Sequence, residues 1–206
     1  MKGLLLKDWC LTVRYGNMQL IFAVVYGVIG AVLPEANAFV ALPVMLIALL
    51  PNTIYAYDER EKWTTYVRAL PVTDAQYVTG KYLYGAICLA VYFALLIAAN
   101  LAFRIDGFAG QFIMFFVGGL LMPSLMMPFM FRFGTERGRL AYLIVFGSAL
   151  TAGLSVANLS YMGGDAPIIE RLGLPWWALC LIALALYVLS WRISIVLYRS
   201  RKNKGK

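Results

Sequence analysis

Six blocks of apolar residues constrain this chain more than any other feature of its sequence. They run approximately over residues 18–33, 38–56, 83–103, 112–131, 140–162 and 176–197. An α-helix needs about 17–25 residues to cross the ~30 Å hydrocarbon core of a bilayer. The chain is 62% hydrophobic and 14% charged, whereas soluble domains average about 45–50% and 25%. The blocks therefore predict a membrane protein.

The same blocks predict helices rather than strands. A segment in lipid must satisfy its backbone hydrogen bonds internally, and none of the blocks shows the alternation of a barrel strand. The predicted fold class is all-α: a polytopic membrane protein with six transmembrane helices in a single domain, residues 1–206.

The positions of lysine and arginine predict the orientation. All but three of the 18 basic residues lie in segments 1–17, 57–82, 132–139 and 198–206; the others are Arg104, Arg171 and Arg192. Because short cytoplasmic loops are enriched in basic residues, we expect a multi-pass protein of the cytoplasmic membrane with both termini cytoplasmic. This topology accounts for the net charge of +8 without nucleic acid as a partner. The basic tail, 198–206, is expected to contact anionic membrane lipid.

Residues 1–16 predict an amphipathic helix ahead of the first span. Leu5, Leu6, Trp9, Cys10 and Val13 fall on one helical stripe. Such a helix would lie in the inner membrane interface. The alternative is a plain extension of the first span.

The longest polar passage, residues 57–82, combines two helix signals with a stop between them. Trp63, Tyr66, Val67 and Leu70 recur at helical spacing and predict an amphipathic helix over 58–70. Pro71 disfavours its continuation, and Thr73 to Gln76 form a capping box that starts a new helix. The passage is either a rigid lever that transmits motion to the membrane helices or a solvated connector.

The fifth block carries a weakly polar stripe. Its members recur at helical spacing: Ser148, Thr151, Ser155 and Asn158. Small and hydroxylated residues commonly mediate helix packing in membranes. The stripe therefore predicts either a helix contact or a wall of a substrate path.

Several kinds of chemistry are missing from the sequence. No charged residue lies in the middle of a predicted span, which disfavours an ion-coupled transporter. The chain has no histidine and only isolated cysteines, so no catalytic or metal-binding motif is recognisable. A phosphate-binding loop is also missing, so any ATP would be bound by another chain. We expect no enzyme activity, no metal and no cofactor in this chain.

Three stretches resemble the ABC-2 type transporter permeases, especially the small six-span bacterial group. They are MKGLLLKDW at the start, YDEREKWTTYVRALPVTDAQYVTGKY after the second block, and PFMFRFGTERGRL after the fourth. The resemblance implies a permease subunit of an ATP-driven exporter. It further implies a second permease subunit, identical or homologous, and two cytoplasmic ABC ATPase subunits that bind ATP and magnesium.

The resemblance also implies site residues. In that family the loop between spans two and three couples to the ATPase. At the matching positions, the ATPase-coupling residues would be Asp58, Glu59, Arg60, Lys62, Trp63, Tyr66, Leu70 and Pro71. A secondary cytoplasmic contact would comprise Phe133, Gly134, Arg137 and Arg139. The pair Thr73-Asp74 departs from the expected basic or serine-rich turn and leaves the details of the loop contact open.

The resemblance and the short outer loops together predict a cargo class. Exporters of this kind move hydrophobic or amphipathic molecules such as peptides, toxins, lipids or drugs, and the sequence does not select among them. An alternative function uses the same polar passage differently: a non-transporting membrane anchor or scaffold that docks a cytoplasmic partner.

Overall fold

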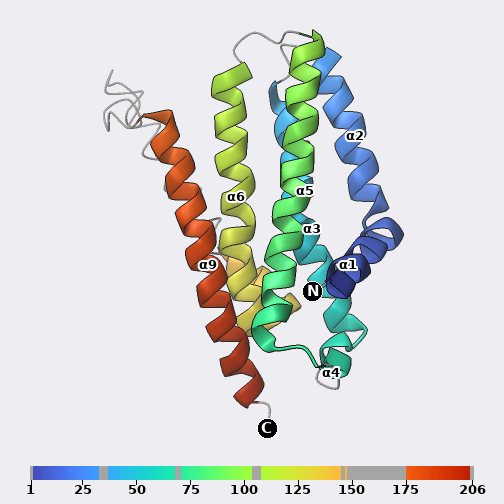
Figure 1. The fold of residues 1–206 in the computed structure, drawn as a ribbon, viewed down its shortest axis with the longest axis vertical. Coiled ribbons are helices and arrows are strands. Elements are labelled where there is room, and N and C mark those ends of the chain that lie inside the picture. The colour runs from blue at the N-terminus through green and yellow to red at the C-terminus, as the bar shows by residue number, and fades with distance from the viewer. Residues whose placement is uncertain are drawn as a thin grey trace.

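Every regular element in the described part of the chain is a helix, which confirms the all-α prediction. The computed structural model describes residues 2–32, 37–67, 71–103, 108–144, 147 and 175–204 (Figure 1). The helices are α1 (Lys2–Tyr15), α2 (Asn17–Val32), α3 (Asn37–Arg60), α4 (Trp63–Val67), α5 (Asp74–Phe103), α6 (Phe108–Phe133) and α9 (Trp176–Lys204), with a further helical stretch at 135–144.

Three of the described helices are long and apolar enough to cross a membrane. Their candidate spans are Asp74–Ala98, Phe112–Phe133 and Trp177–Arg201, and Asn17–Ile29 is a shorter apolar helix. Helices α2, α3, α5, α6 and α9 overlap five of the six predicted blocks. Most of the remaining block, 140–162, lies outside the described residues. The total of six spans therefore stays a prediction.

The long helices run side by side, and α1 lies across them near one end (Figure 1). Helix α6 packs against α9 and α3, while α3 also packs against α2 and α5. The start of α1, the end of α9 and α4 all lie toward the same end of the bundle, which we call the α4 end.

Two apolar clusters form the core. The first joins α2, α3, α5 and α6 in the middle of the bundle and includes Ile47, Leu50, Phe93 and Leu120. The second lies nearer the α4 end, where the buried residues Tyr55, Val78 and Phe131 come from α3, α5 and α6. The α4 end is therefore packed as part of the bundle.

Helix α5 begins with the predicted capping box. The backbone N–H of Gln76 donates to Thr73 Oγ1 at 3.2 Å, and the backbone N–H of Thr73 donates to Gln76 Oε1 at 3.0 Å. This reciprocal pair satisfies two amides that the first turn leaves unpaired. The third predicted span is thereby extended backwards to Asp74.

The prediction of a single helix over 58–70 is wrong, because the described part of this segment is divided between the end of α3 and α4. Helix α3 continues to Arg60, and a turn at Glu61 and Lys62 then separates it from α4. Lys62 adopts a left-handed φ of 54°, and its N–H donates to the carbonyl of Glu59 at 3.1 Å. A helix cannot continue through that conformation. Of the predicted anchors, Leu70 lies outside the described residues.

Helices α3 and α5 approach each other closely where Pro51 meets Gly85. A Cβ added to Gly85 would lie 2.6 Å from Pro51 Cγ, which is part of a ring that cannot move aside. Glycine at this position therefore sets the distance between the two helices.

Replacing Gly85 with alanine should force the α3–α5 contact apart. Overpacking of this kind costs on the order of 1–3 kcal/mol, so we expect a lower thermal unfolding midpoint in detergent. Gly118→Ala is the matched control, because an added Cβ there meets no described residue within 4 Å. Equal midpoints for the two variants would contradict the close contact.

Candidate functional site

Four charged side chains from three helices meet on the inner side of α4. Lys7 Nζ lies 2.7 Å from Asp58 Oδ1 and 3.2 Å from Asp8 Oδ1. Lys81 Nζ lies 2.7 Å from Asp8 Oδ1 and 2.6 Å from Asp58 Oδ2. The group, which we call the charge cluster, joins α1 to the end of α3 and the start of α5.

Three members of the charge cluster are almost completely withdrawn from solvent, and Lys7 is partly exposed. Asp8 and Asp58 are 2% exposed and Lys81 is 1% exposed. Tyr77 adds a neutral donor, with its hydroxyl 3.1 Å from Asp58 Oδ2. Burial and the nearby Lys81 lower the pKa of Lys7, whereas Asp8 and Asp58 oppose that change. Two cations matched to two anions make the burial tolerable, since removal of one partner leaves an uncompensated charge.

Asp58, which the resemblance assigns to the ATPase-coupling residues, is therefore buried. Its carboxylate contacts Lys7 and Lys81. Asp8 was missed altogether. Its one sequence signal is that Asp8 and Thr12, four residues apart, lie away from the apolar stripe of α1.

Helix α1 turns its polar side inward and its apolar side outward. Asp8 and Thr12 are buried, while Leu6, Trp9 and Val13 of the predicted stripe are exposed. This arrangement is the reverse of a water-soluble amphipathic helix and is the one that a helix lying against lipid requires. The location of α1 at a membrane surface stays a prediction.

The outer surface of the α4 segment carries exposed polar groups and one exposed aromatic ring. Arg60, Glu61, Lys62 and Pro71 are exposed, and Tyr66 is 65% exposed. Trp63 faces the other way. It packs against the second core cluster, with Lys7 Nζ 4.8 Å from its ring centroid.

Glu59, the neighbour of Asp58, ties α3 to two other parts of the chain. Its Oε1 accepts from Arg201 Nη2 of α9 at 2.6 Å. Its Oε2 accepts from the backbone N–H of Thr135 at 2.6 Å and also from the Thr135 hydroxyl. The carboxylate therefore caps the N-terminus of helix 135–144, where negative charge is favourable. Burial alone would raise the pKa of Glu59, but the hydrogen bonds from Thr135 and Arg201 hold it below its usual value.

Gly134 is required by this arrangement in two ways. Its φ of +87° lies in the left-handed region that favours glycine. An added Cβ would also lie 2.9 Å from both Glu59 Oε1 and Arg201 Nη2. Gly134 is buried, so it supports the site without offering a surface to a partner.

Members of both sets of residues implied by the resemblance line one cleft of about 850 Å³ at the α4 end. Glu59 and Arg60 come from the first set. The second set contributes all of its members: Phe133, Gly134, Arg137 and Arg139. With Arg201 and Glu136 the lining holds four arginines and two glutamates, so the cleft has a net positive charge. The predicted polar stripe Ser148, Thr151, Ser155 and Asn158 lies outside the described residues.

The charge cluster should behave as one coupled unit. Asp8→Asn or Lys81→Met alone leaves a buried charge unmatched and should each destabilise the protein by on the order of 3–5 kcal/mol. The double variant keeps the remaining pair, Lys7 with Asp58, and should lose clearly less than the sum of the single losses. Unfolding in detergent measures this cycle, and additive losses would show that the two side chains act independently.

The contacts of Glu59 with Thr135 and Arg201, which we call the Glu59 clamp, should weaken in acid. Since the folded pKa of Glu59 is lowered, its stabilisation is present at neutral pH and is lost as the pH falls below about 4.3 through the folded value. For this half-exposed group the effect should be on the order of 1 kcal/mol. The difference in unfolding midpoint between the natural chain and Glu59→Gln should therefore shrink as the pH falls, whereas Glu61→Gln, at an exposed position, should show little difference at any pH.

Comparison with known proteins identifies the family. The family model described as ABC-2 family transporter protein matches residues 3–199. No curated protein sequence and no solved structure matches the chain significantly. The family match covers nearly the whole chain, including every residue of the charge cluster and of the Glu59 clamp except Arg201. The chain therefore belongs to the ABC-2 transporter family and is a membrane subunit of a transporter.

Proposed function

We propose that this chain is the permease subunit of an ATP-driven exporter in the cytoplasmic membrane. In this proposal the α4 end and both termini face the cytoplasm. ATP and magnesium are bound by a separate ABC ATPase, and a second permease subunit completes the membrane part of the complex.

The observation that carries this proposal is an exposed surface mounted on a buried, charge-paired base. Tyr66 and the exposed groups of residues 60–62 offer a partner an aromatic anchor with a polar rim, as protein interfaces commonly do. On the inner side of the same segment, the Trp63 ring contacts the Lys7 ammonium. Lys7 is in turn paired to Asp58.

These contacts give a physical route for coupling. A force on α4 reaches α3 through the short turn at Glu61 and Lys62, and reaches α1 through the contact of Trp63 with Lys7. Asp58 and Lys81 then carry it to α5. Because the buried pairs cannot separate without exposing charge to a medium of low dielectric, the three helices move together.

The positive cleft beside α4 supports a partner of particular chemistry. Arg60, Arg137 and Arg139 are exposed at its lining. Arginine binds carboxylates through paired hydrogen bonds. We therefore expect the ATPase to place an acidic segment in this cleft while Tyr66 enters an apolar pocket on the ATPase.

The proposed cargo is hydrophobic or amphipathic, such as a peptide, toxin, lipid or drug. The exposed surfaces of α2, α5 and α9 are apolar, with Val24, Leu95 and Val196 among the exposed residues. Such surfaces suit molecules already dissolved in the membrane. The stripe from Ser148 to Asn158 remains a candidate wall of the path.

The coupling role can be tested with one exposed aromatic residue and a matched control. Loss of an interface anchor typically costs at least 2 kcal/mol, so Tyr66→Ala should weaken ATPase binding by roughly 30-fold or more. It should leave the unfolding midpoint unchanged. Trp177→Ala removes an aromatic ring that is 66% exposed at the opposite end of α9 and should not change the affinity. Affinity is measured with the purified subunits in detergent.

Two outcomes would count against this proposal. Unchanged ATPase binding and transport in Tyr66→Ala would remove the coupling role of α4. Co-purification of a partner without a phosphate-binding loop, together with no transport, would support the scaffold function instead.

A further inference from the structure

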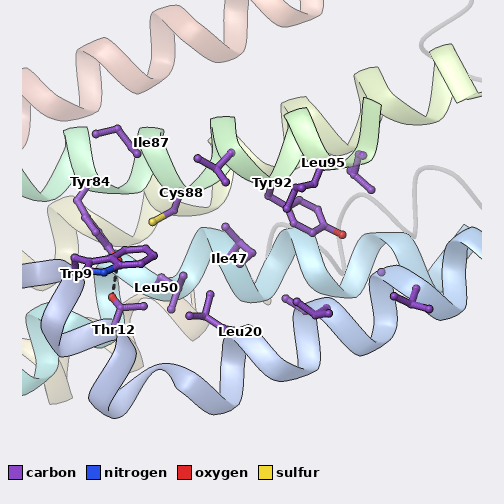
Figure 2. A pocket seen from close by; sticks show the side chains of 16 residues that line it. Trp9, Thr12, Leu20, Ile47, Leu50, Tyr84, Ile87, Cys88, Tyr92 and Leu95 are labelled. Atoms are coloured by element: carbon purple, nitrogen blue, oxygen red, sulfur yellow. Dashed lines mark hydrogen bonds between the residues drawn. The ribbon is translucent and has the colours of Figure 1, made fainter. Parts of the chain in front are cut away.

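An apolar groove runs along the bundle between α2 and α5. It encloses about 440 Å³, which falls within the range of about 300–1,000 Å³ typical of small-molecule sites. Figure 2 shows α2 and α5 on its two sides and α3 along its floor. None of the described residues that line it is charged. We call it the α2–α5 groove.

The groove has a closed floor and an open side. Ala23, Ile47 and Leu50 form part of the floor and are buried. Val24, Val28, Val91 and Leu95 line the groove and are exposed. The open side therefore faces outward between two apolar helices, at the depth where lipid surrounds a spanning helix. A molecule dissolved in the bilayer can enter there without crossing water.

One end of the groove carries two hydroxyl groups that are already paired. Trp9, Thr12 and Tyr84 lie together at the α1 end (Figure 2). The Thr12 hydroxyl donates to the carbonyl of Asp8 at 2.9 Å and shares a hydrogen bond of 2.6 Å with the Tyr84 hydroxyl. These groups need nothing from a ligand.

Deeper in the groove, one polar group does lack a partner. Tyr92 is only 8% exposed, and its hydroxyl makes no hydrogen bond to any described residue. The ring reaches from α5 into the groove (Figure 2), and an added Cβ on Gly27 of α2 would lie 3.6 Å from the hydroxyl. An unpaired hydroxyl in an apolar site is unfavourable, so a bound molecule with an oxygen acceptor at this depth gains a hydrogen bond that nothing else in the groove supplies.

The depth of Tyr92 selects between kinds of ligand. Eight residues of helix, about 12 Å, separate Tyr84 at the α1 end from Tyr92. A phospholipid with its head group at the α1 end keeps its ester carbonyls close to that head group. Its hydrocarbon tail alone would then reach Tyr92 and would leave the hydroxyl unpaired.

We propose that the α2–α5 groove binds a neutral, membrane-dissolved molecule that carries an amide or ester carbonyl within its apolar part, with Tyr92 donating to that carbonyl. A role of this site in cargo transport rests on the proposed export function. Binding at the site does not rest on that function, because binding is measured on the purified chain without an ATPase. Failure of the site and failure of the exporter proposal are thus separate results.

The test uses two photoreactive probes of equal length in vesicles that contain the purified chain. One probe is a dialkyl amide with a diazirine on one alkyl chain, and the other is the corresponding alkane. The amide should label α2 and α5 peptides of the groove saturably. Tyr92→Phe should reduce this labelling about threefold to tenfold, the value of one hydrogen bond. The weaker alkane labelling should not change.

A filling variant and its control separate the groove from the general lipid surface. Gly27→Phe should abolish labelling by the amide, since Gly27 lines the groove. Gly118→Phe places the same side chain on α6 at a position that no described residue covers, and it should leave labelling intact. Equal labelling in both variants would overturn the proposal.

Two other occupants would also overturn it. Labelling of the groove by phosphatidylglycerol with a diazirine in its acyl chain, undiminished by the amide or by Tyr92→Phe, would assign the groove to ordinary lipid. A Val24→Cys variant that forms a disulfide with a second copy in the membrane, with no labelling by the amide, would assign it to an interface between subunits.

Discussion

The pairing of two lysines with two aspartates on the inner side of α4 is the constraint on which the structure of the α4 end depends. In an apolar bundle these charges are tolerable only when each has a partner of opposite charge, because an unpaired charge would be far costlier than in water. Lys7, Asp8, Asp58 and Lys81 come from three helices. Their contacts therefore fix the register of α1, α3 and α5, and with it the position of α4.

The end of α3 serves two separate groups with two consecutive residues. Successive residues on a helix point about 100° apart. Asp58 thus faces α1 and α5, whereas Glu59 faces helix 135–144 and α9. The short stretch before α4 consequently holds both sides of the bundle, and a displacement of α4 acts on both.

Local patterns predicted the helices but not their charged partners. Apolar length located α2, α5, α6 and α9, and the Thr73–Gln76 capping box located the start of α5 because all its contacts lie within one turn. The partner of Asp8 lies 73 residues away, and no periodicity specifies such a pairing. Arg60 and Lys62 lie near Asp58 in sequence, but the ion pairs of its carboxylate are with Lys7 and Lys81. The break at Lys62 depends on one left-handed residue that its own identity does not signal.

The order in which the cluster's members are synthesised has a consequence for biogenesis. Lys7, Asp8 and Asp58 all leave the ribosome before Lys81, so two carboxylates are balanced by one ammonium while the earlier segments insert. Asp8 of α1 lacks its partner Lys81 until α5 is synthesised. Glu59 lacks its partner Arg201 until α9 is synthesised. During synthesis the charge cluster is therefore complete only after α5 has been made, and the contacts of Glu59 only after α9 has been made.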